Sequence, residues 1–529
     1  RTMRAIAEEA FAMVKEYKGS HSGEHGDGLV RSEFHEQMYG SKTVRLFEEV
    51  KDRFDAAGLM NPGKIVRASR MDDRALFRFK PDYQVPEMQT ALDWSAYPGA
   101  GGGFQGAVEM CNNNGECRKH VANVMCPSFR VTGNERDVTR GRANSLRLAI
   151  SGQLGPDAFA SDEMLETMKL CVSCKGCRRE CPTGVDMAKM KIEVMAAANK
   201  RRGLSLRDRL IAYLPRYAPY ASRFAPLMNV RDSIPGAAWL TERLTGLSAK
   251  RPLPRWRRDV FRAPPSPSPS EVHEEGAREV ALFADTFNTY FEPENLRAAF
   301  EVLTRLGYRV TMLSPIDGRR PLCCGRTFLS AGLVEEARVE ARRILAAAAP
   351  LMARDVPIVG LEPSCLLTLR DEFSAMLPGA DTECLASSAY LFEEFLAREA
   401  AAGRLPEAIA EGHGKVLLHG HCHQKAFGAM AAVQSTLGLV GLKVETIESS
   451  CCGMAGAFGY GADTYGASVQ MGELSLLPAV RKAAPDTAIA ADGFSCRHQI
   501  HDGTGRTAVH VARILSDALA ASALKAGRH

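Results

Sequence analysis

The sequence has no long uncharged apolar run and little net charge. No stretch of about 18 uncharged apolar residues occurs, so no transmembrane helix is expected in the 529 residues. No signal-peptide pattern is present, and because the chain opens at Arg1 on a helical pattern we interpret it as a fragment of a longer protein. A net charge of +5 is small for this length and argues against a nucleic-acid partner. We expect a cytoplasmic protein.

The densest basic segment is RPLPRWRRDVFR at 251–262. Such a run beside a proline-rich linker is usually solvated. Peripheral contact with an anionic membrane surface, on the inner face of the cell membrane, stays open as an alternative.

The fifteen cysteines are not spread along the chain as a disulfide framework would be. They fall into tight groups, and grouped cysteines in a large protein favour metal or cluster binding. We therefore expect a reducing compartment and cysteine-bound cofactors.

The clearest group is C-x2-C-x2-C-x3-C, formed by Cys171, Cys174, Cys177 and Cys181 and followed by Pro182. Three thiolates at this spacing can wrap one cube-shaped cluster from a short irregular loop. The fourth cysteine points away, and in two-cluster ferredoxins it binds the other cluster. The run therefore predicts at least one [4Fe-4S] cluster.

A partner group lies upstream at Cys111, Cys117 and Cys126. Pro127 follows Cys126, as proline follows the last cysteine of the ferredoxin run. By the two-cluster logic, Cys126 completes a cluster with the first three cysteines of that run. A four-cysteine zinc site is the alternative, but zinc sites usually separate two C-x2-C pairs.

The remaining cysteines of the two groups, Cys111, Cys117 and Cys181, predict a second cluster that is one cysteine short. Its fourth ligand could be water, a substrate, His120 or another residue. The second cluster could also be absent or of lower nuclearity.

The last 250 residues alternate apolar strand patterns with helical patterns, which predicts two small α/β units. Strands are expected at 280–283, 309–313, 358–360, 416–419, 443–447 and 487–491, with helices at 294–306 and 333–349. Further helices are expected at 5–17, 42–57, 141–153 and 188–201. The predicted domains are the end of one domain (1–70), a connector (71–104), a helical iron–sulfur domain (105–205), a helical segment with a Pro/Ser linker (206–275) and two α/β domains (276–400 and 401–529).

Both α/β units carry a Cys-Cys-Gly tripeptide, followed about 40 residues later by a cysteine in a Ser-Cys context. We interpret this as an internal duplication. Adjacent cysteines reach one site only from a tight turn, which the glycine (Gly453 in the second unit) supplies. The candidate ligands are Cys422, Cys451, Cys452 and Cys496 in the second unit, with His421 and His423 beside the first of them, and Cys323, Cys324 and Cys365 in the first unit.

The first unit has no cysteine to match Cys422, so its site is incomplete. The alternative for both sets is that they are buried thiols, because free cysteine is among the most buried residue types.

A glycine-rich loop, GSHSGEHGDG at 19–28, places two histidines and two carboxylates close together. Glu24 could ligate a divalent metal. His25 could act as a general base, because its ordinary pKa lies near neutrality. A polar turn with solvated side chains is the alternative.

The order of GSHSGEHGDG, NPGKIV (61–66), ALDW (91–94), AVEMCNNNGECRK (107–119), the ferredoxin run and two CCG units resembles a known family. These are large bacterial proteins that fuse an FAD-linked oxidase to an iron–sulfur region, of the D-2-hydroxyglutarate dehydrogenase, D-lactate dehydrogenase and glycolate oxidase type. The resemblance covers essentially the whole chain. CCG alone is shared with heterodisulfide-reductase-like and glycerol-3-phosphate dehydrogenase-like electron carriers.

The resemblance implies a multidomain α+β and α/β fold: the tail of an FAD-linked oxidase C-terminal domain, a dicluster-ferredoxin-like domain and two CCG domains. It implies that Glu24 binds a divalent metal (Zn or Mn) and that His25 takes the substrate's hydroxyl proton. The flavin domain and the other metal ligands belong upstream. The fragment is therefore expected to be inactive alone.

In the intact protein the resemblance implies that electrons pass from reduced FAD through the clusters to a quinone or an electron-carrier protein, after oxidation of a small 2-hydroxy acid. Two alternatives stay open: a separate iron–sulfur subunit that docks on a flavoprotein, and a structural zinc protein. The sequence leaves the particular 2-hydroxy acid, the acceptor, the occupancy of the CCG sites and the oligomeric state undetermined.

Overall fold

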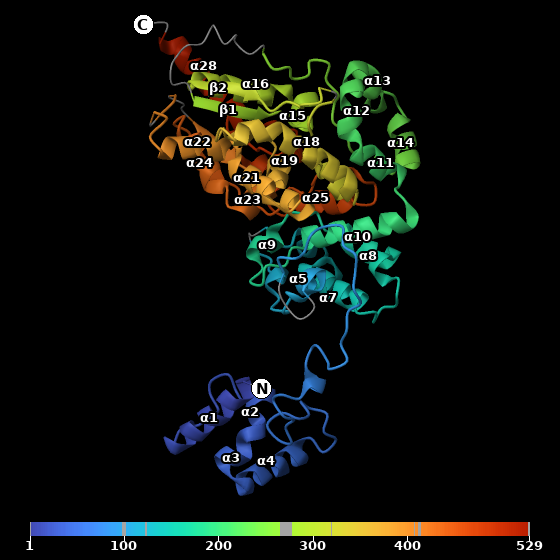
Figure 1. Ribbon diagram of the computed structural model, residues 1–529, viewed down its shortest axis with the longest axis vertical. Coiled ribbons are helices and arrows are strands. Elements are labelled where there is room, and N and C mark those ends of the chain that lie inside the picture. Colours follow the sequence, from blue (N-terminus) through green and yellow to red (C-terminus); the bar gives the residue numbers. More distant parts are fainter. Residues whose placement is uncertain are drawn as a thin grey trace. The chain divides into compact units, whose positions relative to one another are not determined.

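The computed structural model describes residues 2–97, 102–121, 124–264, 278–318, 320–406, 408–410 and 414–526 (Figure 1). The chain forms two compact units, 1–84 and 85–529. Most of the predicted Pro/Ser linker falls at 265–277, and part of the PGAGGG stretch falls at 98–101, both outside the described residues. Within the described ranges, no helix is long and apolar enough to cross a bilayer.

The first unit is built from helices and loops, and its described residues contain no strand. The predicted helix at 42–57 ends earlier, at Phe54, because the Asp55 carboxylate accepts hydrogen bonds from the backbone N–H groups of Leu59 (2.8 Å) and Met60 (2.9 Å) and fixes a turn there. The helices are α1 (Thr2–Glu16), α2 (Gly28–Arg31), η1 (Ser32–Phe34), α3 (His35–Tyr39), α4 (Ser41–Phe54) and η2 (Arg74–Leu76).

The second unit begins with a helical region that carries the first seven cysteines. Short helices alternate with irregular loops, and the long helix α10, half of whose residues are buried, packs against them. The elements are α5 (Gly103–Glu109), η3 (Glu116–Arg118), α6 (Pro127–Thr132), η4 (Glu135–Asp137), α7 (Thr139–Ile150), η5 (Ala158–Ala160), α8 (Asp162–Lys169), α9 (Gly176–Glu180) and α10 (Met187–Arg202).

A strap of short helices follows. Its α12 is strongly amphipathic, and the strap leaves many large apolar side chains exposed. The basic run behind it is not wholly solvated, because Arg251 is buried and pairs with Asp502 at 3.3 Å. The strap consists of α11 (Leu206–Ala212), α12 (Leu214–Ala221), η6 (Ser222–Phe224), α13 (Ala225–Met228), η7 (Val230–Asp232) and α14 (Ala237–Thr245).

Two four-stranded parallel sheets follow, with the strand orders β2-β1-β3-β4 and β6-β5-β7-β8. All six predicted strands are present with small shifts at their ends, but the short edge strands β4 and β8 escaped prediction because two or three residues carry no periodicity. The strands are β1 (Arg278–Phe283), β2 (Tyr308–Met312), β3 (Ile358–Gly360), β4 (Ala389–Leu391), β5 (Lys415–Leu418), β6 (Lys443–Thr446), β7 (Ala488–Ala490) and β8 (Ala508–Val509).

Helices connect and cover the strands of each sheet, which makes both halves α/β. In the first half they are α15 (Thr286–Tyr290), α16 (Pro293–Arg305), α17 (Arg326–Ser330), α18 (Val334–Met352), α19 (Pro363–Arg370), α20 (Glu372–Met376), α21 (Ala380–Ser388) and α22 (Phe392–Ala401). In the second half they are α23 (Cys422–Phe427), α24 (Met430–Gly438), η8 (Phe458–Tyr460), α25 (Tyr465–Glu473), α26 (Leu476–Lys482), α27 (Phe494–Thr504) and α28 (Val511–Ala526).

The two halves pack together at the carboxyl ends of their strands. Glu362, just after β3, accepts a hydrogen bond from the Phe494 N–H at the start of α27 (2.8 Å). The C-terminal helix α28 packs beside α16 of the first half (Figure 1), where Ser516 donates to Glu301 at 2.7 Å. Buried apolar side chains from both halves form one core. The two sheets are therefore parts of one folded body.

The cysteine-rich region is fixed to the first half by buried charges. Lys175 is 1% exposed and pairs with Asp371 and with Glu372 (2.6 Å). Asp371 also pairs with Lys189 at 2.8 Å and with Arg178. Burial alone would raise the pKa of Asp371, but these three cations hold it well below its ordinary value. The carboxylate is therefore ionised and central to this contact.

Candidate iron–sulfur and CCG sites

The structure brings Cys126 together with three cysteines of the ferredoxin run. Cys126 precedes α6, Cys171 follows α8, Cys174 lies in the loop and Cys177 is in the first turn of α9. All four line one pocket. Cys171 is half-buried and the other three are buried. This is the grouping that the two-cluster spacing predicts.

Local backbone geometry makes the loop wrap tightly. Ser173 and Lys175 adopt positive φ angles, +51° and +60°. A Cβ on Gly176 would lie 2.9 Å from both the backbone nitrogen of Met125 and the side chain of Val124, so only glycine fits there. Glu180 accepts hydrogen bonds from the N–H groups of the same two residues. These contacts hold Cys126 against the loop.

The chemistry of this pocket fits an anionic cluster. The buried guanidinium of Arg142 lies 3.8 Å from Cys126 Sγ and donates to Ser128 Oγ at 3.1 Å. Burial raises the pKa of the Cys174 and Cys177 thiols well above the ordinary value, so a positive cofactor core is needed to hold them as thiolates. Arg142 is a functional candidate that the cysteine spacing could not reveal.

The spacing of the four sulfurs disfavours a single zinc ion. Tetrahedral zinc with Zn–S bonds of about 2.3 Å would bring its sulfurs within about 4 Å of one another. No three of these four ligand atoms lie within 4.8 Å of one another, whereas three other groups in the described part of the chain do. Thiolates that bind different corners of an iron–sulfur cluster do not have to approach one another as closely.

The second set of cysteines shares the same core. Cys111 and Cys117 are buried, and Cys181 is half-buried. Cys117 lies on η3 and Cys181 directly follows α9, and these two helices pack against each other. The pKa of Cys117 is raised to about 11, chiefly by burial, with smaller contributions from nearby Cys126 and Cys111. His120, a candidate fourth ligand, is exposed and its ring packs on Phe129. The identity of a fourth ligand stays a prediction.

In the second α/β half, four cysteines converge at the carboxyl end of the sheet. Cys422 opens α23 after β5, Cys451 and Cys452 follow β6, and Cys496 lies in the first turn of α27 after β7. All four are buried in one core cluster. Ligand sites in open parallel sheets form where neighbouring connections diverge, at this end of the strands.

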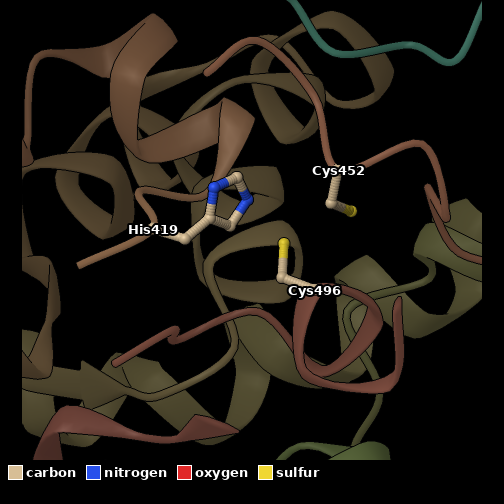
Figure 2. A group of neighbouring side chains, drawn as sticks. All are labelled: His419, Cys452 and Cys496. Atoms are coloured by element: carbon tan, nitrogen blue, oxygen red, sulfur yellow. The ribbon is translucent and has the colours of Figure 1, made fainter. Parts of the chain in front are cut away.

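His419 completes this group (Figure 2). Its Nε2 atom, Cys452 Sγ and Cys496 Sγ all lie within 4.8 Å of one another. Nδ1 of His419 lies 2.9 Å from Ser449 Oγ, and Nε2 is buried without a hydrogen-bond partner in the described structure. A proton on Nδ1 leaves the Nε2 lone pair directed at the sulfurs, as in a metal-ligating histidine.

Sequence patterns indicated the neighbouring histidines and missed His419. His421 caps α23 by accepting from the His423 N–H at 3.1 Å, and His423 Nε2 bonds the Ser173 carbonyl oxygen at 3.0 Å. Neither role is ligation. The signal that could have found His419 is its place at the end of a buried strand, directly before a loop of candidate ligands.

Electrostatics single out Cys452 in this group. Hydrogen bonds with Cys451 and Cys496 hold the pKa of Cys452 well below its ordinary value despite burial. Lys425 lies in the field of all four cysteines, and its ammonium group donates to Ser449 Oγ at 3.1 Å. A thiolate beside a half-buried lysine suits ligation of an anionic cofactor.

The first half reproduces the local geometry with fewer ligands. Cys365 occupies the third position of α19, as Cys496 does in α27. The N–H of Gly325 donates to Cys323 Sγ at 3.4 Å, and Gly453 donates to Cys451 Sγ at the same distance. The glycines have φ angles of +76° and +88°, as the predicted tight turns require.

Thr286 opens α15 at the position where Cys422 opens α23. A hydrogen bond with Cys324 lowers the pKa of Cys365, but burial and the carboxylates of Asp285 and Glu362 raise it to about 12. A hydrogen bond with Cys452 and burial raise the pKa of the matching Cys496 as well, so the two sets differ chiefly in the missing fourth cysteine. The first-half set is therefore the poorer candidate for cofactor binding.

The histidine-rich loop lies in the first unit and is exposed. His25 Nε2 lies 3.1 Å from a Glu24 carboxylate oxygen, and both side chains are more than 80% exposed. The group with metal-binding spacing is a different one: His21, Asp27 and His35. His35 lies outside the predicted loop; it is buried and bonds Asp27 at 3.0 Å. The structure gives no support to a divalent metal at Glu24.

Comparisons with known proteins match two segments of the chain. Residues 107–185 match the family model "4Fe-4S dicluster domain", and residues 1–65 match "FAD linked oxidases, C-terminal domain". A segment similar to the end of an FAD-linked oxidase therefore precedes a segment similar to a dicluster iron–sulfur domain in this chain. The predicted resemblance and the predicted [4Fe-4S] and FAD association are thereby confirmed.

The chain is 26% identical to D-2-hydroxyglutarate dehydrogenase of Escherichia coli (strain K12) over 558 aligned positions, covering 95% of the chain and 52% of that protein. It is 27% identical to the D-2-hydroxyglutarate dehydrogenase of Pseudomonas putida, over 96% of the chain and 52% of the relative. A subunit of the anaerobic glycerol-3-phosphate dehydrogenase of Escherichia coli is 25% identical over 60% of the chain and 78% of its own length. The chain spans about half the length of the D-2-hydroxyglutarate dehydrogenases it matches.

The two CCG sets make a matched pair for mutation. Replacing Cys452 by alanine is expected to lower the metal content of the chain, because it removes the thiolate of the complete group. Replacing Cys324, the second cysteine of the other CCG, is expected to change it little. Metal content by mass spectrometry, with the spectrum of the ferredoxin-type cluster as an internal reference, checks this. An equal loss of metal in both variants would contradict the conclusion that only the second-half group binds a cofactor well.

Proposed function

We propose that this chain is the iron–sulfur electron-transfer portion of a flavin-dependent D-2-hydroxy-acid dehydrogenase of the D-2-hydroxyglutarate or D-lactate type. The observation that carries it is the convergence of Cys126 with Cys171, Cys174 and Cys177 around one pocket, in a chain that also contains the end of an FAD-linked oxidase. A [4Fe-4S] cluster in this pocket takes up and releases one electron at a time.

Four cysteines hold this first cluster, and Arg142 offsets its negative charge from a buried position. Cys111, Cys117 and Cys181 are proposed ligands of a second cluster. The second-half group, Cys422, Cys451, Cys452 and Cys496, is proposed to hold a further cofactor, and the matching set Cys323, Cys324 and Cys365 belongs to a duplicated, incomplete CCG domain. Electrons from reduced FAD pass through these sites to a quinone or a carrier protein.

The pocket of the ferredoxin-type cluster and the four-cysteine group of the second α/β half adjoin each other. The charge of Cys422 contributes to the raised pKa of Cys174, and Val124, Cys174 and the second-half cysteines share one buried cluster. His423 bridges the two segments through its bond to Ser173. Packed, buried contact of this kind excludes water between donor and acceptor and fixes their separation.

His25 is proposed to remove the hydroxyl proton of the 2-hydroxy acid in the intact enzyme. The ring is accessible, since its side chain is 82% exposed, and Glu24 lies beside it. A carboxylate partner stabilises the imidazolium that forms when the proton is taken. This loop favours an enzyme over a pure carrier, since an electron carrier has no use for a general base.

A separate electron-transfer subunit is the second candidate function. The similarity to the glycerol-3-phosphate dehydrogenase subunit, over 60% of the chain, supports it. The FAD-linked oxidase match at 1–65 supports the first candidate instead.

Iron and acid-labile sulfide in anaerobically purified chain test the proposal, together with electron paramagnetic resonance after reduction. About eight irons and eight sulfides are expected from the two clusters, with more if the CCG sites are filled. The reduced chain should then give up its electrons to ferricyanide. Zinc without sulfide would overturn both candidate functions and leave a structural metal protein.

A further inference from the structure

A second pocket, of about 820 Å³, lies between the helical strap and α27. Trp256 and Phe291, whose ring centroids are 4.5 Å apart, form an aromatic wall. Pro226 and Leu253 add apolar surface, and His498 adds a polar group. The rest of the lining is largely polar or charged: Asn229, Ser233, Arg255, Arg257, Arg258, Glu292, His501 and Asp502. Glu292 Oε1 lies 3.6 Å from His498 Nε2. A volume of about 300–1,000 Å³ is typical of sites for small organic ligands.

Two large apolar side chains are exposed beside this pocket. Phe224 and Leu227 do not line it, but they adjoin Ala225 and Pro226, which do, and they are 63% and 70% exposed. Large exposed apolar side chains gathered around a pocket mark a binding surface. A ligand that enters here passes over apolar side chains, which favours a molecule dissolved in lipid.

Exposed basic residues stand at the same mouth. Arg255 and Arg258 line the pocket and are exposed, whereas Arg257 is neutralised by Asp259 (2.7 Å) and Glu294 (3.1 Å). Lysine and arginine beside apolar side chains suit the headgroup region of an anionic bilayer.

The pocket is also next to the second-half cysteines. His498 lies two residues after Cys496 on α27, and its Nδ1 is 3.5 Å from the hydroxyl of Tyr460. Tyr460 is buried in the same core cluster as Cys451, Cys452 and Cys496. Burial raises the pKa of Tyr460, and the charge of Cys452 makes a smaller contribution. His498 and Tyr460 therefore link the pocket lining to the core cluster that contains these cysteines.

We propose that this pocket binds and reduces a lipid-soluble quinone. The proposal rests on the electron-transfer function given above and names the acceptor's place. The quinone ring packs on the Trp256–Phe291 wall, and His498 donates a hydrogen bond to a carbonyl oxygen. Two electrons arrive singly from the cysteine-bound cofactors. Two protons come from solvent, so that quinone plus two electrons and two protons gives the quinol.

The test uses the 529-residue chain reduced with dithionite, freed of excess reductant and mixed with decylubiquinone. Reoxidation of the clusters should be rapid. Trp256→Ala and His498→Gln should each slow it by about tenfold or more, because each removes a main contact with the ring or its carbonyl. Trp239→Ala is the matched control, since Trp239 is 58% exposed on the strap and does not line the pocket.

Two further readouts separate the possible failures. Reoxidation by ferricyanide should be equal in all variants, and a wild-type chain that reduces ferricyanide but not decylubiquinone overturns this inference while leaving the electron-transfer function intact. Quenching of tryptophan fluorescence by decylubiquinone measures binding without any cluster. Saturable quenching that persists in Trp239→Ala and is lost in Trp256→Ala supports the pocket, whereas quenching that is equal in the two variants overturns it.

Discussion

Replacing Cys177 by alanine is expected to remove the ferredoxin-type cluster, with a loss of about four irons and four sulfides per chain. Cys177 is buried in the first turn of α9 and lines the pocket with the other three ligands. Burial raises its pKa, so the thiolate exists there only if a positive cofactor core stabilises it. Iron and sulfide analysis, with the electron paramagnetic resonance spectrum, measures the loss.

Cys384 provides the matched control. It is exposed on α21 and belongs to none of the cysteine groups. Cys384→Ala should keep the full iron content, the spectrum and the rate of ferricyanide reduction. If Cys177→Ala kept the same iron content as this control, the proposed ligand set would be wrong.

The second large effect is expected at Asp371. Changing it to asparagine should lower the free energy of unfolding by about 3–5 kcal/mol, because Lys175 is left buried without its full complement of negative charge. Lys175 is 1% exposed and Asp371 is 3% exposed, so water cannot replace the lost partner. Urea unfolding followed by circular dichroism, under anaerobic conditions, gives the difference.

The loss should depend on pH in a defined direction. Since the pKa of Asp371 is held below its ordinary value in the folded chain, its contribution is complete above the unfolded pKa, about 3.9. It is lost as the pH falls through the lower folded pKa. The difference between wild type and Asp371→Asn should therefore be constant from neutral pH to about pH 5 and shrink below about pH 4.

Asp486→Asn is the control for this effect. Asp486 is exposed on the loop between α26 and β7, where a surface substitution changes stability by about 0.5 kcal/mol or less. A similar small change for Asp371→Asn would contradict a central role for Asp371 in joining the cysteine-rich region to the first α/β half.

Much of the fold could be predicted because its signals are local. Continuous apolar runs such as 280–283 and 358–360 mark strands buried on both faces, and the predicted bounds of β3 agree with those in the structure. The edge strands β4 and β8 were missed, since pairing with a neighbour defines them more than their own sequence does. Helix ends shifted where side chains intervene, as Asp55 does after α4.

The candidate site residues also fall into those that local sequence patterns reveal and those that only the fold reveals. The cysteines were found from spacing, and the pairing of Cys126 with the ferredoxin run followed from the two-cluster logic. Arg142, His419 and Lys425 were not found. Arg142 reaches Cys126 through tertiary packing from α7, which carries no motif, whereas His419 and Lys425 lie beside Cys422 in the sequence and only the fold shows that they face the cysteine group. The proposed quinone pocket is formed by residues far apart in sequence, such as Trp256 and His498, and no local pattern announces it.

The core shared by Val124, Cys174 and the cysteines of the last α/β half has a consequence for how this protein can be divided. The ferredoxin-like segment is therefore not an independent domain. Its removal would expose apolar side chains of the last α/β half, and removal of the last α/β half would expose Cys174 to water and oxygen. Recombination with a related electron carrier should therefore succeed only when both stretches are exchanged together.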